Sequence, residues 1–221
     1  MDSLTAAWNK LKKNSQNPFS GIKVKAVPTV SKALSDEDLI KIRDNLHLLK
    51  DKVKVQSICS HKKYMKYLLL CFYLGGIDMV DLKNLRYDKN VMNGRIEFTR
   101  SKGGTNVRVS NRLFPEALEL LKEFNCKPYL IPLHKLNYDN LMGNMSREYG
   151  KIQETLSLSK KPYSKAAWYT FITRAQNMLI DERCTMSIVG HVQSTTHSIY
   201  KDEFPQHIKD KAHYKIIDLS I

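Results

Sequence analysis

The sequence lacks any long hydrophobic run. Its longest apolar stretch, Tyr67 to Ile77, is about 11 residues long and contains two glycines, whereas a membrane-spanning helix needs roughly 18 apolar residues. The N-terminus lacks the apolar core of a secretion signal, because Asp2, Asn9 and Lys10 surround its few apolar residues. We therefore expect no transmembrane helix, no membrane partner and a cytoplasmic location.

Paired cysteines are also missing. The chain has 4 cysteines, far apart in sequence, and none forms a CxxC pair: Cys59, Cys71, Cys126 and Cys184. This spacing argues against a zinc ribbon and against a secreted disulfide framework. The sequence predicts free, buried thiols, and it contains no internal repeat or low-complexity tract.

Acidic residues are few, with 22 Asp plus Glu against 36 Lys plus Arg, which gives a formal charge of +14 and a pI near 9.5. This excess predicts an anionic partner. Hydrophobic residues make up 42% of the chain, including 11 Tyr and 7 Phe, so the chain can bury an ordinary core. A wholly disordered basic protein is therefore excluded, and the length suits one large domain.

Apolar spacing predicts a mostly helical domain with one small antiparallel sheet, an α+β fold. Ser35 with Asp38 before an apolar period resembles a capping box that opens the first helix. The expected helical ranges are 35–50, 57–74, 81–85, 115–124, 138–156, 163–179 and a stretch through 186–188. Alternation over 95–100 and 107–109 around Gly103 and Gly104 predicts a basic hairpin. Residues 1–30 contain Pro18 and Pro28 and are interpreted as the end of an upstream region followed by a linker. This interpretation implies either that an upstream domain was cut away or that the N-terminus is naturally short.

A His and a Tyr near the C-terminus carry the most specific pattern. Residues 190–200 read GHVQSTTHSIY, and this GHxxxTTxxxY pattern resembles the C-terminal signature of the tyrosine recombinase, or phage integrase, family. The resemblance implies that His191 and Tyr200 share one scissile phosphate and that Tyr200 is the nucleophile.

Further segments resemble the same family in family order. The hairpin segment 99–104 (TRSKGG) places Lys102 where the family has a lysine that reaches the cleavage site. Segment 74–82 (LGGIDMVDL) resembles the first conserved box, and 162–173 (PYSKAAWYTFIT) resembles the second. Residues 17–39 resemble the junction that precedes the catalytic domain in mobile-element integrases. The resemblance therefore spans nearly the whole chain.

Both arginines that this family uses to bind the phosphate are missing from the expected positions. In the first box the arginine position falls on Asp78 in one alignment and on Gly75 in another. In the second box the HxxR pair falls on Lys165 and Trp168, followed by Tyr169. Losing one such preorganised donor typically costs about 2.7 to 4 kcal/mol of transition-state stabilisation.

Other cations near these motifs are candidate replacements. Arg100 is two residues before Lys102, so a strand would place both side chains on one face. Lys165 can donate to phosphate as a point charge, without the bidentate geometry of arginine. Arg174 is a poorer candidate, because six helical residues turn it about 240 degrees away from Trp168.

The resemblance implies that residues 31–221 form the catalytic domain of a DNA integrase, with a C-terminal tail from about 201 that docks on a neighbouring protomer. It implies cleavage of double-stranded DNA through a 3′-phosphotyrosyl intermediate on Tyr200. Lys102 would protonate the leaving group, and His191, Arg100 and Lys165 would stabilise the transition state. No cofactor or metal is implied, and a DNA-bound homotetramer is.

Two other interpretations remain open. One is a catalytically disabled member of the same fold that binds DNA as an architectural or regulatory protein, which the missing arginines favour. The other is an RNA-binding or other basic helical protein in which the motifs occur by chance. The joint presence of Tyr200, His191 and Lys102 favours the recombinase.

Overall fold

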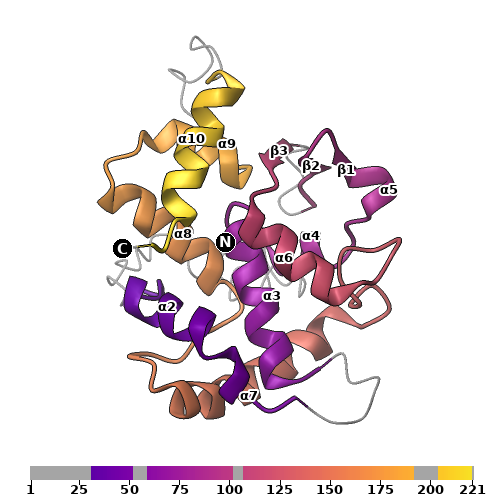
Figure 1. Ribbon diagram of the computed structural model, residues 1–221, viewed down its shortest axis with the longest axis vertical. Helices are drawn as coiled ribbons and strands as arrows, with labels where there is room; N and C mark the ends of the chain where they lie inside the picture. The colour runs from indigo at the N-terminus through magenta and orange to yellow at the C-terminus, as the bar shows by residue number, and fades with distance from the viewer. Residues whose placement is uncertain (1–30, 52–58, 102–106, 192–203, 221) are drawn as a thin grey trace, which may run out of the picture. The chain divides into compact units, whose positions relative to one another are not determined.

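The structure is a computed structural model that describes residues 31–51, 59–101, 107–191 and 204–220 (Figure 1). The chain divides into two units, Met1–Ser31 and Lys32–Ile221, and nearly all described residues belong to the second. In chain order its elements are α2 (Asp36–Asp44), the short 3-10 helix η1 (Leu46–Leu48), α3 (His61–Tyr73), α4 (Met79–Leu82), α5 (Tyr87–Asn90), β1 (Val91–Met92), β2 (Arg95–Thr99), β3 (Arg108–Arg112), α6 (Pro115–Phe124), α7 (Tyr138–Leu156), α8 (Ala166–Asn177), α9 (Glu182–Val189) and α10 (Gln206–Ile217). The expected mostly helical fold with a small antiparallel sheet is confirmed.

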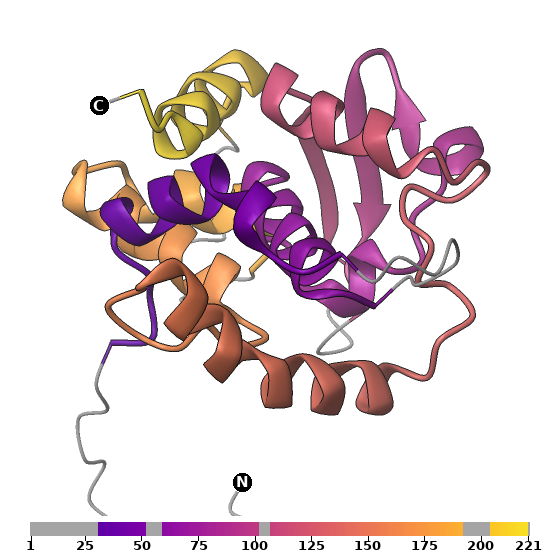
Figure 2. The same ribbon diagram turned by 60° about the horizontal axis from the view of Figure 1, so that its bottom comes forward.

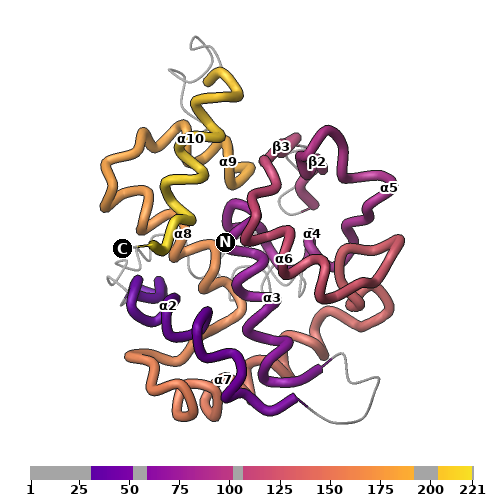
Figure 3. The backbone as a smooth tube through the Cα atoms, viewed as in Figure 1, coloured from indigo at the N-terminus to yellow at the C-terminus, as the bar shows by residue number. Residues whose placement is uncertain are grey.

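Helix α3 is the centre of the core. Every residue from Tyr67 to Tyr73 is buried, so this helix is apolar around its whole circumference and needs neighbours on all sides. Figure 3 shows α8, α9 and α10 on one side of α3, and the sheet and α6 on the other side. Helix α7 crosses the opposite end of the molecule from α10, as Figure 2 shows.

Helix α2 begins as predicted but ends earlier. The Ser35 hydroxyl accepts the Asp38 N–H at 3.1 Å, as expected for an N-cap. The Asp38 carboxylate does not complete a capping box, because it accepts hydrogen bonds from the Ser159 N–H at 2.9 Å and the Ser159 hydroxyl at 2.5 Å. The helix ends at Asp44 rather than near Lys50, because the Asn45 side chain bonds back to the Lys41 carbonyl at 3.0 Å.

The sheet has the order β1-β2-β3 and is antiparallel throughout. Ile96 pairs with Asn111 and Phe98 with Val109, and these four side chains are buried on one face. The hairpin predicted from the alternation is therefore confirmed, and β1 and α5 are additions that the pattern did not predict. Its turn, residues 102–106, lies outside the described residues.

The C-terminal segment forms a helix, α10, that packs on its own chain. Ile216, Ile217 and Leu219 are all buried, and the His213 Nε2–H donates to the Tyr73 carbonyl at 3.0 Å. These side chains are buried within the domain, and α10 contacts α8, α9 and β3. Docking of the C-terminal tail on a neighbouring protomer stays a prediction.

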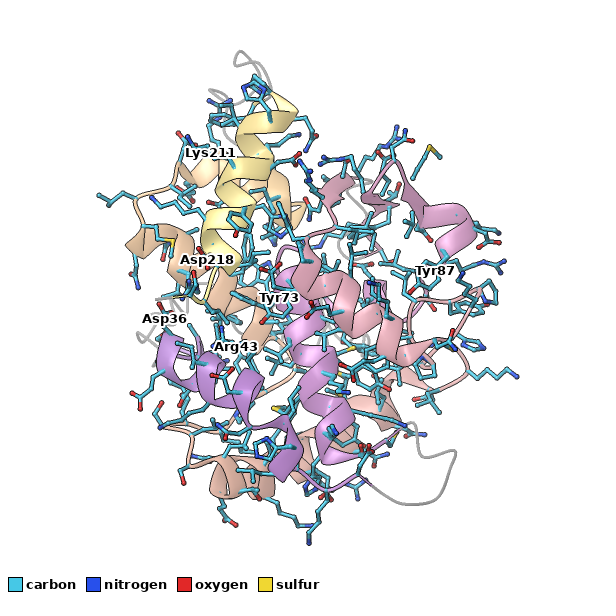
Figure 4. The ribbon with its side chains drawn as sticks, in the orientation of Figure 1. Asp36, Arg43, Tyr73, Tyr87, Lys211 and Asp218 are labelled. Carbon is cyan, nitrogen blue, oxygen red and sulfur yellow. The ribbon has the colours of Figure 1, made fainter. Side chains whose placement is uncertain are left out.

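Arg174 and Arg43 attach the end of α10 to the domain. The Arg174 Nε–H donates to the Ile216 carbonyl at 2.7 Å and its Nη2–H to the Asp218 carbonyl at 2.8 Å, while its guanidinium also pairs with Asp36. Figure 4 labels Asp36, Arg43 and Asp218, which lie together where α2 meets the end of α10. Arg174 therefore has a structural role, as its predicted helix face implies.

All four cysteines are free, with Cys71 and Cys184 buried and Cys59 and Cys126 half-buried. None of the helices in the described part of the chain combines the length and the apolar character needed to cross a bilayer.

Candidate active site

The loop after α3 is the point where the predicted motifs converge. Gly75 and Gly76 have φ angles of +96° and +69°, which favour glycine. A Cβ on Gly75 would lie 2.5 Å from the Asn111 side-chain nitrogen and 3.0 Å from Ile188. Position 75 therefore has no room for a side chain. Of the two positions considered for the first arginine, only Asp78 carries a side chain within this group of elements.

Asn111 holds this convergence together. Its side-chain amide donates to the Leu74 carbonyl at 2.9 Å and to the Ile188 carbonyl at 3.0 Å, and the residue is 3% exposed. One strand residue thereby joins the end of α3 to the end of α9. Because a buried amide without partners is costly, these two hydrogen bonds offset the burial of Asn111 in β3.

Arg100 and Asp78 form an almost buried ion pair. The Arg100 Nη2–H donates to Asp78 Oδ2 at 2.9 Å, and the two side chains are 9% and 8% exposed. The Arg100 Nη1–H donates to the Gly190 carbonyl at 3.2 Å. The guanidinium from the end of β2 therefore bridges the residue before α4 and the residue before His191. Sequence reasoning proposed Arg100 as a replacement cation but did not predict its partner.

His191 follows α9 directly. Gly190 ends that helix in the left-handed conformation, with φ +72°, and the His191 N–H donates to the Met186 carbonyl at 2.9 Å. The His191 side chain is exposed, and its ring centre is 5.6 Å from that of Trp168 on α8. Trp168, the residue at the second arginine position, is thus a direct neighbour of the candidate histidine.

Asp81 fixes the start of the hairpin turn. Its Oδ1 accepts the Ser101 N–H at 2.9 Å, and the residue is 3% exposed. Its Oδ2 is buried and has no hydrogen-bond partner among the residues that the structure describes. A cavity of about 290 Å³ beside this contact is lined by Asp78, Val80, Ser101 and Tyr138. Burial and the nearby carboxylates of Asp78 and Asp81 raise the pKa of Tyr138, so its hydroxyl remains neutral there.

The remaining predicted residues fall into two groups. Lys165 is exposed at the N-terminus of α8, one turn before Trp168. Tyr200 and Lys102 lie outside the described residues, although Lys102 directly follows Ser101 in the chain. The structure thus brings Arg100, Asp78, Gly190, His191 and Trp168 into one connected group.

In this group the Asp78 carboxylate balances the charge of the Arg100 guanidinium. The exposed imidazole of His191 and the indole ring of Trp168 belong to the same group. Arginine has further N–H groups besides the two in use, and these suit a phosphate oxygen. Within the described residues, no set of three or more His, Cys, Asp or Glu side chains is placed to hold a metal ion.

No protein-family model matches the chain, and no curated protein matches it in sequence. Its fold matches a lambda integrase dimer bound to a COC′ core site, with a TM-score of 0.58, 15% identity and coverage of 90% of this chain and 57% of that one. An integrase from mycobacterium phage Brujita matches with a TM-score of 0.59, 15% identity and coverage of 99% and 70%. The site-specific recombinase XerH bound to its difH substrate matches with 0.53, 18% identity and coverage of 95% and 62%.

This chain therefore spans between 57% and 70% of the length of these three integrases and recombinases, and the identity is low throughout. The match in fold covers between 90% and 99% of this chain. The chain has the fold of the tyrosine recombinase catalytic domain.

Proposed function

We propose that the chain binds duplex DNA through its phosphates and cleaves one strand by attack of Tyr200 on a phosphodiester. The Tyr200 hydroxyl gives its proton to water as its oxygen forms a bond to phosphorus, the bond from phosphorus to the 5′ oxygen breaks, and Lys102 gives a proton to the 5′ oxygen. His191 and Arg100 stabilise the charge on the phosphate, with Lys165 as a further cation. The reverse reaction rejoins the strands, and a homotetramer on DNA performs the exchange.

One observation carries this proposal. Arg100 contacts both Asp78, where one of the two alignments puts the family's first arginine, and the carbonyl of Gly190, next to His191. A guanidinium from the hairpin is thus in contact with one candidate arginine position and with the residue before the candidate histidine, which supports the proposal. A donor held in advance by a folded scaffold needs no reorganisation when charge develops on a phosphate.

A second candidate function is a DNA-binding protein with a disabled centre. It is favoured by Asp78 itself, since a carboxylate at the first arginine position both neutralises Arg100 and repels a phosphate. Trp168 at the second arginine position brings an uncharged ring to His191 instead of a cation. In this function the +14 charge of the chain binds DNA phosphates without cleavage.

A covalent trap separates the two candidates. The protein is incubated with nicked suicide duplexes from the ends of its own mobile element, and adducts that resist denaturation are sought, with Tyr200→Phe as the control. An adduct in the parent protein that disappears in the control supports the recombinase.

Salt-sensitive DNA binding without any adduct supports the disabled protein. Recovery of an adduct by Asp78→Arg with Trp168→Arg would then identify the missing arginines as the reason. Gly75→Arg is unsuitable for this purpose, because a side chain at position 75 collides with Asn111.

A further inference from the structure

The ion pair between Asp78 and Arg100 lies at the candidate phosphate site, which we define as Arg100 and its neighbours Gly190 and His191. Both side chains are less than one-tenth exposed, and Nη2 and Oδ2 are 2.9 Å apart. The same guanidinium touches the carbonyl that precedes His191. Asp78 is therefore the anion that Arg100 binds in the DNA-free protein.

A phosphate that approaches Arg100 meets this carboxylate. Its oxygens would accept from the guanidinium N–H groups that Asp78 and Gly190 do not use, which places two anions on one cation. Like charges within a few ångströms repel strongly in a partly buried site, where water screens them poorly. The phosphate must either displace the carboxylate or bind beside it against this repulsion.

We propose that Asp78 is an internal counter-ion that competes with the DNA phosphate for Arg100 and thereby lowers the affinity of the site. The inference rests on the proposed DNA-binding function and adds a residue that regulates it. A phosphate that binds Arg100 must offset the loss of the contact between Arg100 and Asp78, so it binds more weakly than it would without this carboxylate.

The geometry allows the charge to be removed with little change of shape. Asp78→Asn keeps a carbonyl oxygen that accepts from Arg100, while the negative charge is lost. The chain also offers a matched control, because Arg95 and Asp210 form a second ion pair with distances of 2.7 and 2.9 Å and 17% exposure for each side chain. Arg95 is five residues from Arg100, about 16 Å along the strand. Asp210→Asn raises the net charge of the chain by the same amount, away from the site.

The test is a salt titration of binding to a fluorescent duplex of mixed sequence, with folding checked by circular dichroism and urea unfolding. Asp78→Asn is expected to bind about tenfold more tightly, since 1.4 kcal/mol of relieved repulsion corresponds to that factor. Its plot of log affinity against log salt is expected to be steeper by about 0.9, because one more phosphate is neutralised. Neither change is expected for Asp210→Asn, or for Asp78→Asn in an Arg100→Gln background. Asp78→Ser removes the same charge and gives a second measurement should the Asn variant fold poorly.

Three results would overturn the inference in different ways. Equal tightening by Asp78→Asn and Asp210→Asn would mean that net charge alone acts. Unchanged or weaker binding by both Asp78 variants, with an unchanged salt slope, would mean that Asp78 only positions Arg100, and DNA binding would then stand without the counter-ion. Absence of salt-dependent binding in the parent protein would overturn the proposed function itself.

Discussion

Gly190 is a position where the backbone of the site is sensitive to substitution. Its φ angle is +72°, and a Cβ built on it would lie 2.5 Å from Val109 Cγ2 and 3.4 Å from Arg100 Cδ. Val109 belongs to β3 and is fully buried, so its methyl group has no space to move into. Gly190→Ala therefore combines backbone strain with overpacking.

Gly94 provides a control for the share of this loss that comes from backbone strain. Gly94 has a φ angle of +71°, but no atom lies within 4 Å of its built Cβ. An alanine in the left-handed conformation costs about 1 kcal/mol, and both variants share this cost. Overpacking a dense core adds about 1 to 3 kcal/mol. We expect Gly94→Ala to lose about 1 kcal/mol of unfolding free energy and Gly190→Ala about 2 to 4 kcal/mol.

Urea unfolding of the two variants beside the parent protein measures the difference. Val109→Ala should reduce the loss caused by Gly190→Ala, because it removes the methyl group that the new Cβ meets. Equal losses for Gly94→Ala and Gly190→Ala, or no coupling with Val109→Ala, would refute the close approach of β3 to the end of α9.

Three more predictions concern the core around the site. Burial lowers the pKa of His213 to about 4 from 6.5, so the unfolded chain takes up a proton at a higher pH than the folded chain does. Protonation of His213 is therefore expected to reduce the unfolding free energy by about 3 kcal/mol as the pH falls from 7 to 4. Urea unfolding across that range should show a smaller fall in unfolding free energy for His213→Phe than for the parent protein. Gly75→Ala, at φ +96° and 2.5 Å from the Asn111 amide, should lower the melting temperature more than Gly94→Ala does. Arg174→Ala leaves the Ile216 and Asp218 carbonyls without their donor and should cost about 3 kcal/mol in urea unfolding, whereas loss of the exposed Lys165 side chain should be nearly neutral.

Helices with strong local signals could be predicted to the residue. The helix expected over 115–124 has a proline at its first position and ends at Asn125 in the left-handed conformation, and α6 has the same bounds. The helix expected over 138–156 likewise matches α7, whose apolar residues recur on one face. Capping residues and apolar spacing act within a few residues of the chain, so a sequence pattern contains them.

Two helices were predicted less well, one because its partners are distant in sequence and the other because of a local side chain. The helix α10 was not predicted, because its apolar spacing is weak and its polar residues pair with Arg95 in β2 and with Tyr73 in α3. The first helix was predicted too long, since only the local bond of Asn45 to Lys41 decides where it ends. Tertiary contacts form α10 despite its weak apolar spacing, and the Asn45 side chain ends α2 although the apolar spacing continues beyond it.

The candidate site divides in the same way. Apolar spacing predicted a mostly helical domain with a small antiparallel sheet, which the structure confirms. The family resemblance selected Arg100, Lys165 and His191 as candidate site residues, and their binding of an anion stays a prediction. Only the folded chain showed that Asp78 pairs with Arg100 across 22 residues of sequence and that Gly190 accepts from it across 90. A side chain's charge is a property of its residue, whereas the partner that balances that charge is set by the packing of strand, loop and helix around it.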